Sequence, residues 1–432
     1  MKWVKTTVGD FCPFIYGKAI KKQDQLEQGF AVYGSNGVYA YSANKLVESS
    51  SVIIGRKGSV GKLHLSQQPC WVSDTAFYVQ QEAIEDNYFA YYLLSTLGLE
   101  DMNTDAAVPG LNRNNAHRLE IKIPENITDR HKLIEPLITL DKKIKINQKI
   151  NQTLEQIAQA IFKSWFVDFE PTKAKIAVLD AGGSEDDALL AAMTAISGKS
   201  NAELKQFKNV SPEQYDKLKS TAELFPSEMQ DSELGGIPKG WSCLSLDGIA
   251  HYQNGLALQR YRPESDEDDF LPVVKIAQLR QGYTDGKEKA SVNINPACIL
   301  ENGDVVFSWS GSLIVDIWNG GKAALNQHLF RVSSSNFPKW FYYLYTKHHL
   351  ASFQSIAAAK AVTMGHINRR HLTEALCAVP LDEHLAVFNS TFQSLLDLGS
   401  NLVLEAKTLE TLRDTLLPRL LSGEIEVSTV AK

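Results

Sequence analysis

The sequence has few cysteines and no closely spaced pair of them. The five lie far apart along the chain, at Cys12, Cys70, Cys243, Cys298 and Cys377. No C-x-x-C pair occurs, and no histidine follows a cysteine at the spacing that zinc sites use. This pattern argues against both a disulfide framework and a structural zinc site.

Long apolar runs are also missing. No stretch approaches the roughly 18 apolar residues that a membrane-spanning helix needs. The opening residues, Met1–Lys5, contain no apolar signal-peptide core. With 44% hydrophobic and 22% charged residues, the composition is that of soluble globular domains. We expect a cytoplasmic protein with no membrane partner, and 432 residues suggest two or three domains.

Catalytic motifs are absent as well. Gly55–Leu63 resembles a phosphate-binding loop, but a Walker motif needs Gly at position 56 and Ser or Thr at position 63. The chain has no Pro-Asp dipeptide for a nuclease site and no Asn/Asp-Pro-Pro-aromatic run for amino methylation. Glu120-Ile121-Lys122 fits an exposed strand face, and His348-His349 fits a solvated helix end better than a metal site. We therefore expect a non-enzymatic chain without a cofactor or metal of its own.

Charge gives no sign of a strong non-specific DNA binder. The net charge is −6, and the acidic excess lies mainly in residues 171–240 and 382–432. Residues 1–126 and 241–381 are each nearly neutral. Near-neutral domains can carry a basic face, but the isolated chain should not bind DNA strongly without sequence preference.

Two segments carry apolar residues in alternating steps of three and four, the pattern of coiled-coil helices. The first, His131–Phe166, is interrupted at Asn147 and Asn151, and its seam is Leu133, Leu137, Leu140, Ile144, Leu154, Ala158, Ile161 and Trp165. The second, near the C-terminus, has poor positions at Gly399 and Arg413, and its seam is Leu385, Phe388, Phe392, Leu395, Leu402, Ala406, Leu409, Leu416 and Leu420. Because so narrow a stripe needs a partner, we expect the two helices to pair antiparallel.

The sequence ahead of each long helix is repeated. Several matches share an offset of 253, and those at the start of each copy share an offset of 238. The second copy therefore has about 15 extra residues ahead of its glycine-serine loop. The matched segments are Val52–Ile54 with Val305–Phe307, Ala90–Leu94 with Trp340–Leu344, Gly110–Arg113 with Gly365–Arg369, Trp3 with Trp241, and Gly17 with Gly255. One unit, a β-rich domain and a long helix, is used twice.

These patterns predict an α+β fold in which two β-rich domains are separated by an antiparallel two-helix coiled coil, with a pseudo-twofold internal repeat. The predicted domains are a β-rich domain at 1–126, a spacer helix at 127–170, a connector at 171–240, a second β-rich domain at 241–381 and a C-terminal spacer helix at 382–425. Within the connector we expect a loop over 181–187, a helix within 201–208 and a helix that begins at Pro212. We assign it no chemistry.

Residues at matching positions of the two β-rich domains are the candidates for reading DNA. The scaffold repeats while these side chains differ, as two sites for two different sequences would. Arg prefers guanine edges, Asn and Gln prefer adenine, and hydroxyl groups bind phosphates. Any one of these residues could instead serve ordinary turn chemistry. The candidates are Arg56, Lys57, Ser59, Ser73, Thr75, Asn112 and Arg113 in the first domain, and Trp309, Ser310, Ser312, Asn326, Gln327, His328, Asn368, Arg369 and Arg370 in the second.

Two segments are specific enough to indicate a family. Phe162–Pro171 reads FKSWFVDFEP and Ser232–Trp241 reads SELGGIPKGW. Together with the repeat, they make the chain resemble the specificity (S) subunit of type I restriction-modification enzymes over nearly its whole length. The resemblance implies two target-recognition domains that read an asymmetric, bipartite site in double-stranded DNA, one half each.

The resemblance also implies partners. The family's specificity subunit is non-catalytic, holds two adenine methyltransferase (M) subunits and is joined by restriction (R) subunits. S-adenosylmethionine, ATP and Mg²⁺ would then belong to those partner subunits. For the helices that would dock the methyltransferase, we expect Trp165 to be buried in the coiled coil and Phe166, which lies off the seam, to contact a partner. The alternative is a non-enzymatic scaffold whose two domains bind proteins.

Overall fold

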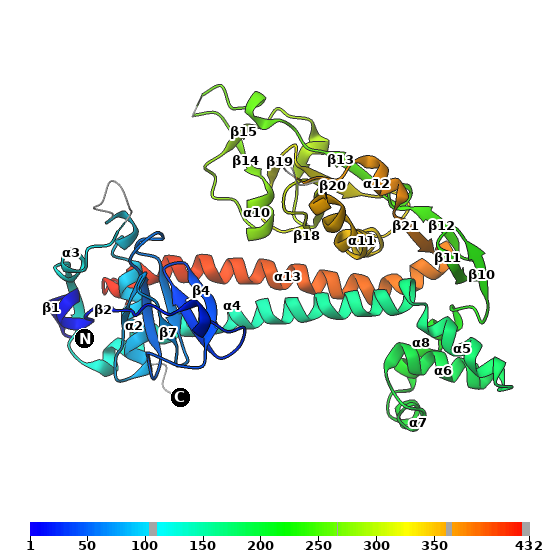
Figure 1. Cartoon of the computed structure of the whole chain (residues 1–432), viewed down its shortest axis with the longest axis horizontal. Helices are drawn as coiled ribbons and strands as arrows, with labels where there is room; N and C mark the ends of the chain where they lie inside the picture. Colours follow the sequence, from blue (N-terminus) through cyan, green and yellow to red (C-terminus); the bar gives the residue numbers. More distant parts are fainter. Residues whose placement is uncertain (103–109, 266, 360–364, 426–432) are drawn as a thin grey trace. The chain divides into compact units, whose positions relative to one another are not determined.

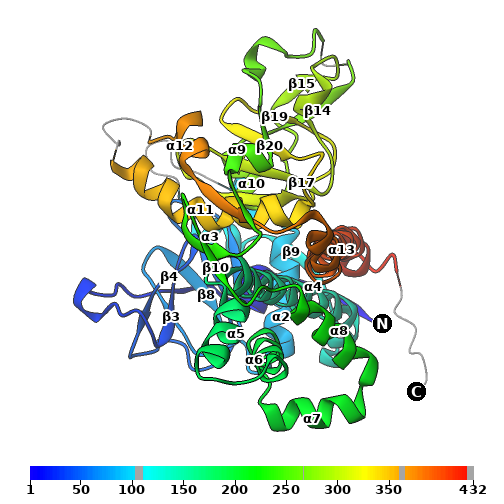
Figure 2. The ribbon, with the colours of Figure 1, turned by 90° about the vertical axis from the view of Figure 1, so that its right-hand side faces the viewer.

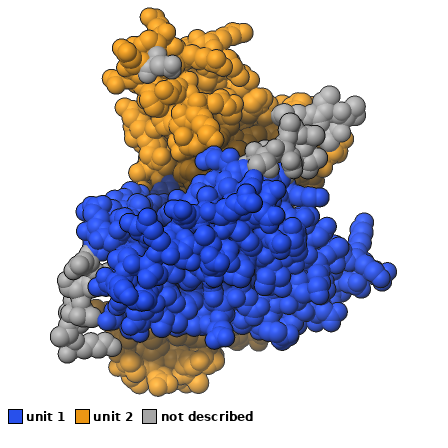
Figure 3. Space-filling view, turned by 90° about the vertical axis from the view of Figure 1, so that its left-hand side faces the viewer, with its two compact units in different colours: residues 1–146, 406–432 blue, residues 147–405 orange. Residues whose placement is uncertain are grey.

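The computed structural model describes residues 1–102, 110–265, 267–359 and 365–425. The chain forms two compact units (Figures 1 and 3). Unit 1 comprises Met1–Ile146 and the C-terminal segment from Ala406, and unit 2 comprises Asn147–Glu405. Within the described ranges, no helix combines the length and apolarity that crossing a membrane would require.

The β-rich domain of unit 1 contains two small sheets. One has the order β2 (Ile15–Tyr16), β8 (Ala76–Val79), β5 (Ser51–Gly55) and β6 (Leu63–Ser66). The other has the order β4 (Gly37–Ser42), β3 (Phe30–Gly34) and β7 (Trp71–Val72), with β3 and β7 parallel. Helix α2 (Ile84–Ser95) packs on β5 and β6, and the core includes Val52, Ile54, Phe77 and Phe89.

The ends of this domain are joined by a separate pair of strands. Strand β1 (Trp3–Thr7) runs antiparallel to β9 (Glu120–Pro124), and the short helices α1 (Val8–Phe11) and α3 (Arg113–His117) lie next to this pair in sequence and contact each other. Strand β9 then leads into the long helix α4 (Ile127–Phe162).

The β-rich domain of unit 2 has the same topology. One of its two four-stranded sheets has the order β13 (His251–Asn254), β20 (Leu329–Ser333), β17 (Asp304–Ser308) and β18 (Val315–Trp318), which matches β2-β8-β5-β6 strand for strand. Its other sheet has the order β15 (Lys289–Ser291), β14 (Phe270–Val274), β19 (Ala323–Leu325) and β16 (Ile299–Leu300). Strands β14 and β19 pair in parallel, as β3 and β7 do.

The remaining elements of this second domain also follow the repeat. Helix α11 (Lys339–Ala359) corresponds to α2, and β12 (Ser242–Ser245) pairs with β21 (Leu376–Val379) as β1 pairs with β9. The helices α9 (Leu246–Ile249) and α12 (Arg369–Glu374) correspond to α1 and α3. Helix α10 (Ile276–Gln281) and strand β16 have no counterpart among the elements of unit 1. The predicted internal repeat is confirmed, and the extra residues lie ahead of the second glycine-serine loop.

Within unit 2, α4 and α13 (Asp382–Leu421) pair antiparallel (Figure 1). Asn147 is fully buried, and its Nδ2 donates to Oε2 of Glu405 at 2.7 Å. One turn further along α4, Asn151 lies against Gly399, where an added Cβ would be 2.6 Å from Oδ1 of Asn151. The polar position of one seam therefore faces the glycine of the other, which favours this register over shifted ones.

Within unit 1, the first half of α4 also runs antiparallel to the end of α13. Leu133 and Leu137 share a core with Leu420. Asp141 accepts a hydrogen bond from Nη1 of Arg413 at 2.7 Å and another from the Tyr92 hydroxyl at 2.5 Å. Arg413, a poor seam position by sequence, is thus the ion-pair partner of a residue on the facing helix. The predicted antiparallel pairing is confirmed in each unit.

This ion pair gives a stability prediction. The Arg413→Ala change leaves the partly buried carboxylate of Asp141 without its cation, so unit 1 should lose about 1–2 kcal/mol of unfolding free energy. Urea unfolding followed by circular dichroism measures the loss. The matched control is Arg419→Ala on the same helix, whose ion pair with Glu424 is about half exposed and should contribute under about 0.5 kcal/mol. Equal losses in the two variants would contradict the role given to Asp141.

The end of α4 corrects one prediction. A π-helical turn, η3 (Lys163–Val167), follows α4 and turns both Trp165 and Phe166 inward, because a wider turn shifts the residues after it around the helix. Phe166 is only 1% exposed, and its ring centroid lies 5.6 Å from that of Trp241 and 5.5 Å from that of Trp340. The expectation that Phe166 contacts a partner is wrong. The expected burial of Trp165, at 3% exposure, is confirmed.

The connector contains more structure than the sequence indicated. It forms α5 (Glu170–Asp180), α6 (Glu185–Ser197), α7 (Asn201–Val210) and α8 (Pro212–Glu223), then a hairpin of β10 (Met229–Ser232) and β11 (Gly235–Pro238) (Figure 2). The helices have a small core of Ala192, Met193, Leu204 and Ala222. Helices α7 and α8 were predicted, whereas α5 was not. The loop expected over 181–187 is wrong in part, because its acidic residues form the first turn of α6 behind the Ser184 cap.

Candidate nucleic-acid interface

Three segments of the first domain that the sequence singled out meet at one place. The backbone N–H groups of Arg56 and Lys57 donate to the carbonyl oxygen of Thr75, at 2.9 and 3.1 Å. The N–H of Leu111 donates to the carbonyl oxygen of Arg56 at 2.9 Å. The glycine-rich loop after β5, the turn before β8 and the segment before α3 are therefore held together by main-chain hydrogen bonds, which do not depend on side-chain identity.

The second domain repeats this arrangement. The N–H of Trp309 donates to the carbonyl oxygen of His328 at 3.3 Å, and the N–H of Ile367 donates to that of Trp309 at 3.0 Å. A further bond joins Gly311 N–H to the Gly365 carbonyl at 2.9 Å. Each domain thus presents the same three-segment frame. We call it the recognition frame, comprising 55–61, 73–75 and 110–113 in the first domain and 308–312, 326–328 and 365–370 in the second.

Three of the predicted DNA-contacting side chains are buried. Ser73, Ser310 and Asn326 are each 3% exposed. The hydroxyl of Ser73 is 2.7 Å from that of Thr75, the hydroxyl of Ser310 is 2.9 Å from Nδ1 of His328, and Oδ1 of Asn326 accepts from the N–H of His328 at 3.3 Å. For these three the prediction of direct DNA contact is wrong, since their side chains are buried and bond to other residues of the recognition frames.

The other candidates reach the surface to different extents. Asn112 is exposed, but its Oδ1 caps α3 by accepting from the N–H groups of Asn114 and Asn115. Asn368 occupies the matching position ahead of α12 and is also exposed. Also exposed are Lys57, Ser312, Arg369 and Arg370, while Arg56, Ser59, Thr75, Arg113, Trp309, Gln327 and His328 are partly exposed. For all of these, DNA contact stays a prediction.

The sequence did not point to the aromatic residue on which two arginines of the first recognition frame stack. Tyr16, at the end of β2, is 48% exposed. The guanidinium carbon of Arg113 lies 4.9 Å from the centroid of its ring, and that of Arg56 lies 5.4 Å away. The only sequence signal was that Tyr16 directly precedes the repeated Gly17.

The second recognition frame is stacked differently. Trp309 replaces Arg56, its ring lies 5.9 Å from that of Phe330, and its Nε1 donates to the carbonyl oxygen of Gln327 at 3.2 Å. The guanidinium of Arg369 lies 5.6 Å from the Phe330 ring and donates to the carbonyl oxygen of Tyr252 at 3.0 Å. The two frames therefore share a backbone but offer different groups to a ligand.

Comparison with known proteins supplies the family. A model described as the type I restriction modification DNA specificity domain matches residues 1–156 and 238–383. The chain belongs to this family. The two matched stretches each contain one β-rich domain, so this is a type I specificity subunit with the domain present twice.

Named relatives agree with this assignment. The specificity subunit of the type I restriction enzyme HindI from Haemophilus influenzae is 31% identical over 330 residues, which cover 73% of this chain and 71% of the relative. The MjaIX specificity subunit from Methanocaldococcus jannaschii is 22% identical over 397 residues, covering 89% and 79%. A solved type I S subunit from M. genitalium shares the fold, with a TM-score of 0.50 at 13% identity over 99% of this chain and 97% of that one.

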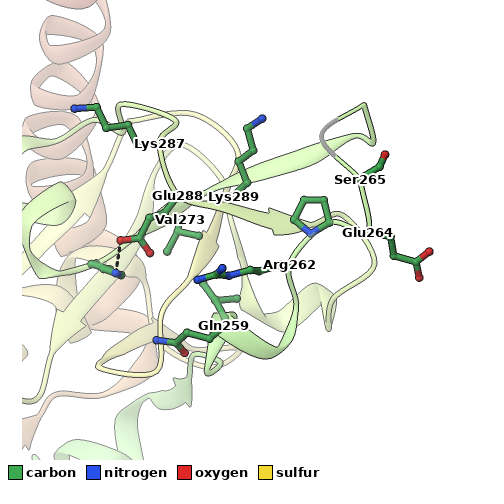
Figure 4. A pocket seen from close by; sticks show the side chains of 11 residues that line it. Gln259, Arg262, Glu264, Ser265, Val273, Lys287, Glu288 and Lys289 are labelled. Atoms are coloured by element: carbon green, nitrogen blue, oxygen red, sulfur yellow. Dashed lines mark hydrogen bonds and ion pairs between the residues drawn. The ribbon is translucent and has the colours of Figure 1, made fainter.

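The specificity subunit has a basic hollow that the sequence did not reveal. It lies in the second domain, in the segment around β14 and β15, and has a volume of about 700 Å³ (Figure 4). Arg262 and Lys289 line it, and Lys275 at its edge forms an ion pair with Glu288. Glu264 also lines the hollow, so the net charge there is only modestly positive.

The histidine pair of the specificity subunit is not a solvated helix end. Helix α11 continues to Ala359, so His348 and His349 lie in its middle. His348 is exposed, but His349 is half-buried, its Nε2 is 3.1 Å from the carbonyl oxygen of Leu376, and burial lowers its pKa to about 4. Among the residues that the structure describes, no group of three or more His, Cys, Asp or Glu side chains is placed to hold a metal ion.

Proposed function

We propose that this specificity subunit reads a bipartite, asymmetric site in double-stranded DNA, with one half-site for each β-rich domain. The observation that carries the proposal is the recognition frame itself. Its main-chain hydrogen bonds recur in both domains, whereas the side chains at matching positions differ: Trp309 stands where the first domain has Arg56, and buried Ser310 stands where it has exposed Lys57. A fixed frame with exchangeable side chains is what two base-reading surfaces of different specificity require.

The subunit is proposed to be non-catalytic and to hold two adenine methyltransferase subunits, with restriction subunits completing the complex. S-adenosylmethionine, ATP and Mg²⁺ would be bound by those partners. Since Phe166 is buried, docking must use other residues. Ile150 and Ile157 on α4 are 42% and 41% exposed on the outside of the helix pair, and two isoleucines two turns apart suit the apolar face of a partner helix.

The test of DNA reading uses the chain reconstituted with its cognate methyltransferase subunit. The complex should methylate adenine in a two-part motif and retain duplexes that carry it, with retention falling as salt rises. Duplexes with either half scrambled serve as controls. A complex that ignores DNA sequence, or a chain that binds proteins across its two domains without any DNA preference, would overturn the proposal in favour of a scaffold.

The proposal further expects the paired helices to set the gap between the two half-sites. Removing one heptad from each helix, around Asn151 and Gly399, shortens the pair by roughly 10 Å, or about 3 base pairs of B-form DNA. Methylation of a duplex set with graded gaps should then shift to a shorter gap or be lost. Methylation of a continuous motif, or an unchanged gap preference in the shortened variant, would contradict this part of the proposal.

A further inference from the structure

Two arginines of the first recognition frame share one aromatic ring. Arg56 comes from the loop after β5 and Arg113 from the first turn of α3, and both guanidinium groups lie within 5.4 Å of the centre of the Tyr16 ring. Phe77 packs beside both groups, because its ring centroid lies 4.9 Å from that of Tyr16 and 5.9 Å from the guanidinium carbon of Arg56. Stacking on a ring face fixes the plane of a guanidinium while leaving its edge free to donate.

The two cations have no protein counter-charge in the described part of the chain. No ion pair joins either arginine to a carboxylate there, and the Nε atoms of Arg56 and Arg113 are each buried without a hydrogen-bond acceptor. The pKa of the neighbouring His117 is lowered, first by burial and second by the positive charge of Arg113. Two guanidinium groups beside one ring repel each other, and a buried donor without an acceptor costs about 1–3 kcal/mol. Both arginines are partly exposed, so a ligand that supplies acceptors would meet their other N–H groups and not the buried Nε atoms.

We propose that Arg56 and Arg113 read guanine in the half-site of the first domain and that Tyr16 is the residue that positions them. This inference rests on the proposed function and deepens it. In B-form DNA the major-groove edge of guanine offers O6 and N7, two acceptors that match the fork of one guanidinium. A planar arginine held edge-outward recognises that pair, whereas a phosphate is bound by any nearby cation.

The second domain sets the contrast. Trp309 stands where the first domain has Arg56, and Arg369 already donates one N–H group to the carbonyl oxygen of Tyr252. Among the described residues, a pair of ring-stacked arginines without an ion-pair partner therefore occurs in the first recognition frame and not at the matching positions of the second. The guanines that depend on it should all lie in one half of the motif.

The experiment compares the wild-type complex with variants of the full chain, each with its methyltransferase subunit. Duplexes with randomised half-sites are methylated, selected and sequenced. Arg56→Lys and Arg113→Lys keep the charge but lose the fork, so each should lower the preference for guanine at one position by roughly 5- to 150-fold. Both changes should fall in the same half-site and leave the other half unaltered. Arg118→Lys, an exposed arginine at the end of α3, is the matched control and should change nothing.

Tyr16 is tested by separating its ring from its hydroxyl. Tyr16→Leu should relax the same guanine positions as the two lysine variants, while Tyr16→Phe, which keeps the ring, should retain the wild-type preference. Because Tyr16 is half exposed, thermal unfolding should be little changed in both, so lost specificity is distinguished from lost folding.

Several outcomes would overturn the inference alone: a two-part motif without guanine in either half, guanine preferences that survive both lysine variants, or a uniform loss of affinity for all sequences, which marks phosphate contact. A wild-type complex that reads no two-part motif would instead overturn the proposed function, and the inference with it.

Discussion

Replacing Phe166 by alanine is expected to lower the unfolding free energy of unit 2 by about 3–5 kcal/mol. The ring is at the centre of an aromatic cluster that joins the π-helical turn, α11 and the first half of α13. Its centroid lies 5.5 Å from that of Phe388, 5.9 Å from that of Phe392 and 5.8 Å from that of Phe341. Several large, rigid rings cannot collapse into the space that the change leaves, so the cost should be near the upper end of the range.

Chemical unfolding measured by tryptophan fluorescence follows this change, since Trp165, Trp241 and Trp340 surround the site. Phe166→Leu keeps most of the apolar volume and should cost less than the alanine variant. Phe270→Ala removes a phenylalanine that is 41% exposed and should change stability by less than about 1 kcal/mol. If Phe166→Ala weakened only methyltransferase binding and left unfolding unchanged, the buried position of this ring would be wrong.

The sequence predicted the long helices and the repeat because both signals are local. A heptad seam is recognised from the spacing of apolar residues along one helix. A repeat is recognised from similar residues that recur in the same order at a fixed offset. The polar positions in the seams were recognised only as interruptions. Their meaning depends on which residues face each other: Asn151 lies against Gly399, and Arg413 pairs with Asp141.

The features that the sequence did not predict depend on backbone detail or tertiary contact. A single π-helical turn rotates Phe166 inward, and no heptad count anticipates one wider turn. In the connector, the acidic run of Glu185–Asp187 has loop-like composition, yet it fits the first turn of a helix because of the Ser184 cap. Propensity alone cannot separate these two interpretations.

Much the same holds for the candidate site. The repeat identified the three segments of each recognition frame, and their backbones do meet. Which side chains point outward could not be read from it, because the burial of Ser73 and Ser310 and the exposure of Lys57 depend on the segments that fold around each residue. The sequence did not predict the role of Tyr16, because β2 has only two residues and is too short to show an alternating pattern.

Adding a methyl group at Gly17 should damage reading of the first half-site, and the same change at Gly255 should damage reading of the second. A Cβ at Gly17 would be 2.0 Å from the carbonyl oxygen of Ser73, and one at Gly255 would be 2.2 Å from that of Asn326. Both obstacles are backbone atoms, which cannot rotate away. Each glycine follows the first strand of its sheet and lies against the middle segment of its recognition frame. The alanine must therefore push that segment aside by more than 1 Å.

Such a displacement would break base contacts worth about 1–3 kcal/mol each, so discrimination by the affected half should fall roughly ten-fold or more. Competition binding by the reconstituted complex, with duplexes scrambled in one half or the other, measures each half separately. Gly236→Ala is the control, because the nearest atom to its added Cβ is the end of the Met229 side chain, 3.7 Å away. The two frames lie in different compact units. Gly17→Ala should therefore weaken discrimination at the first half-site only, and Gly255→Ala at the second half-site only. Loss of both halves in either variant would show that the two domains do not read DNA independently.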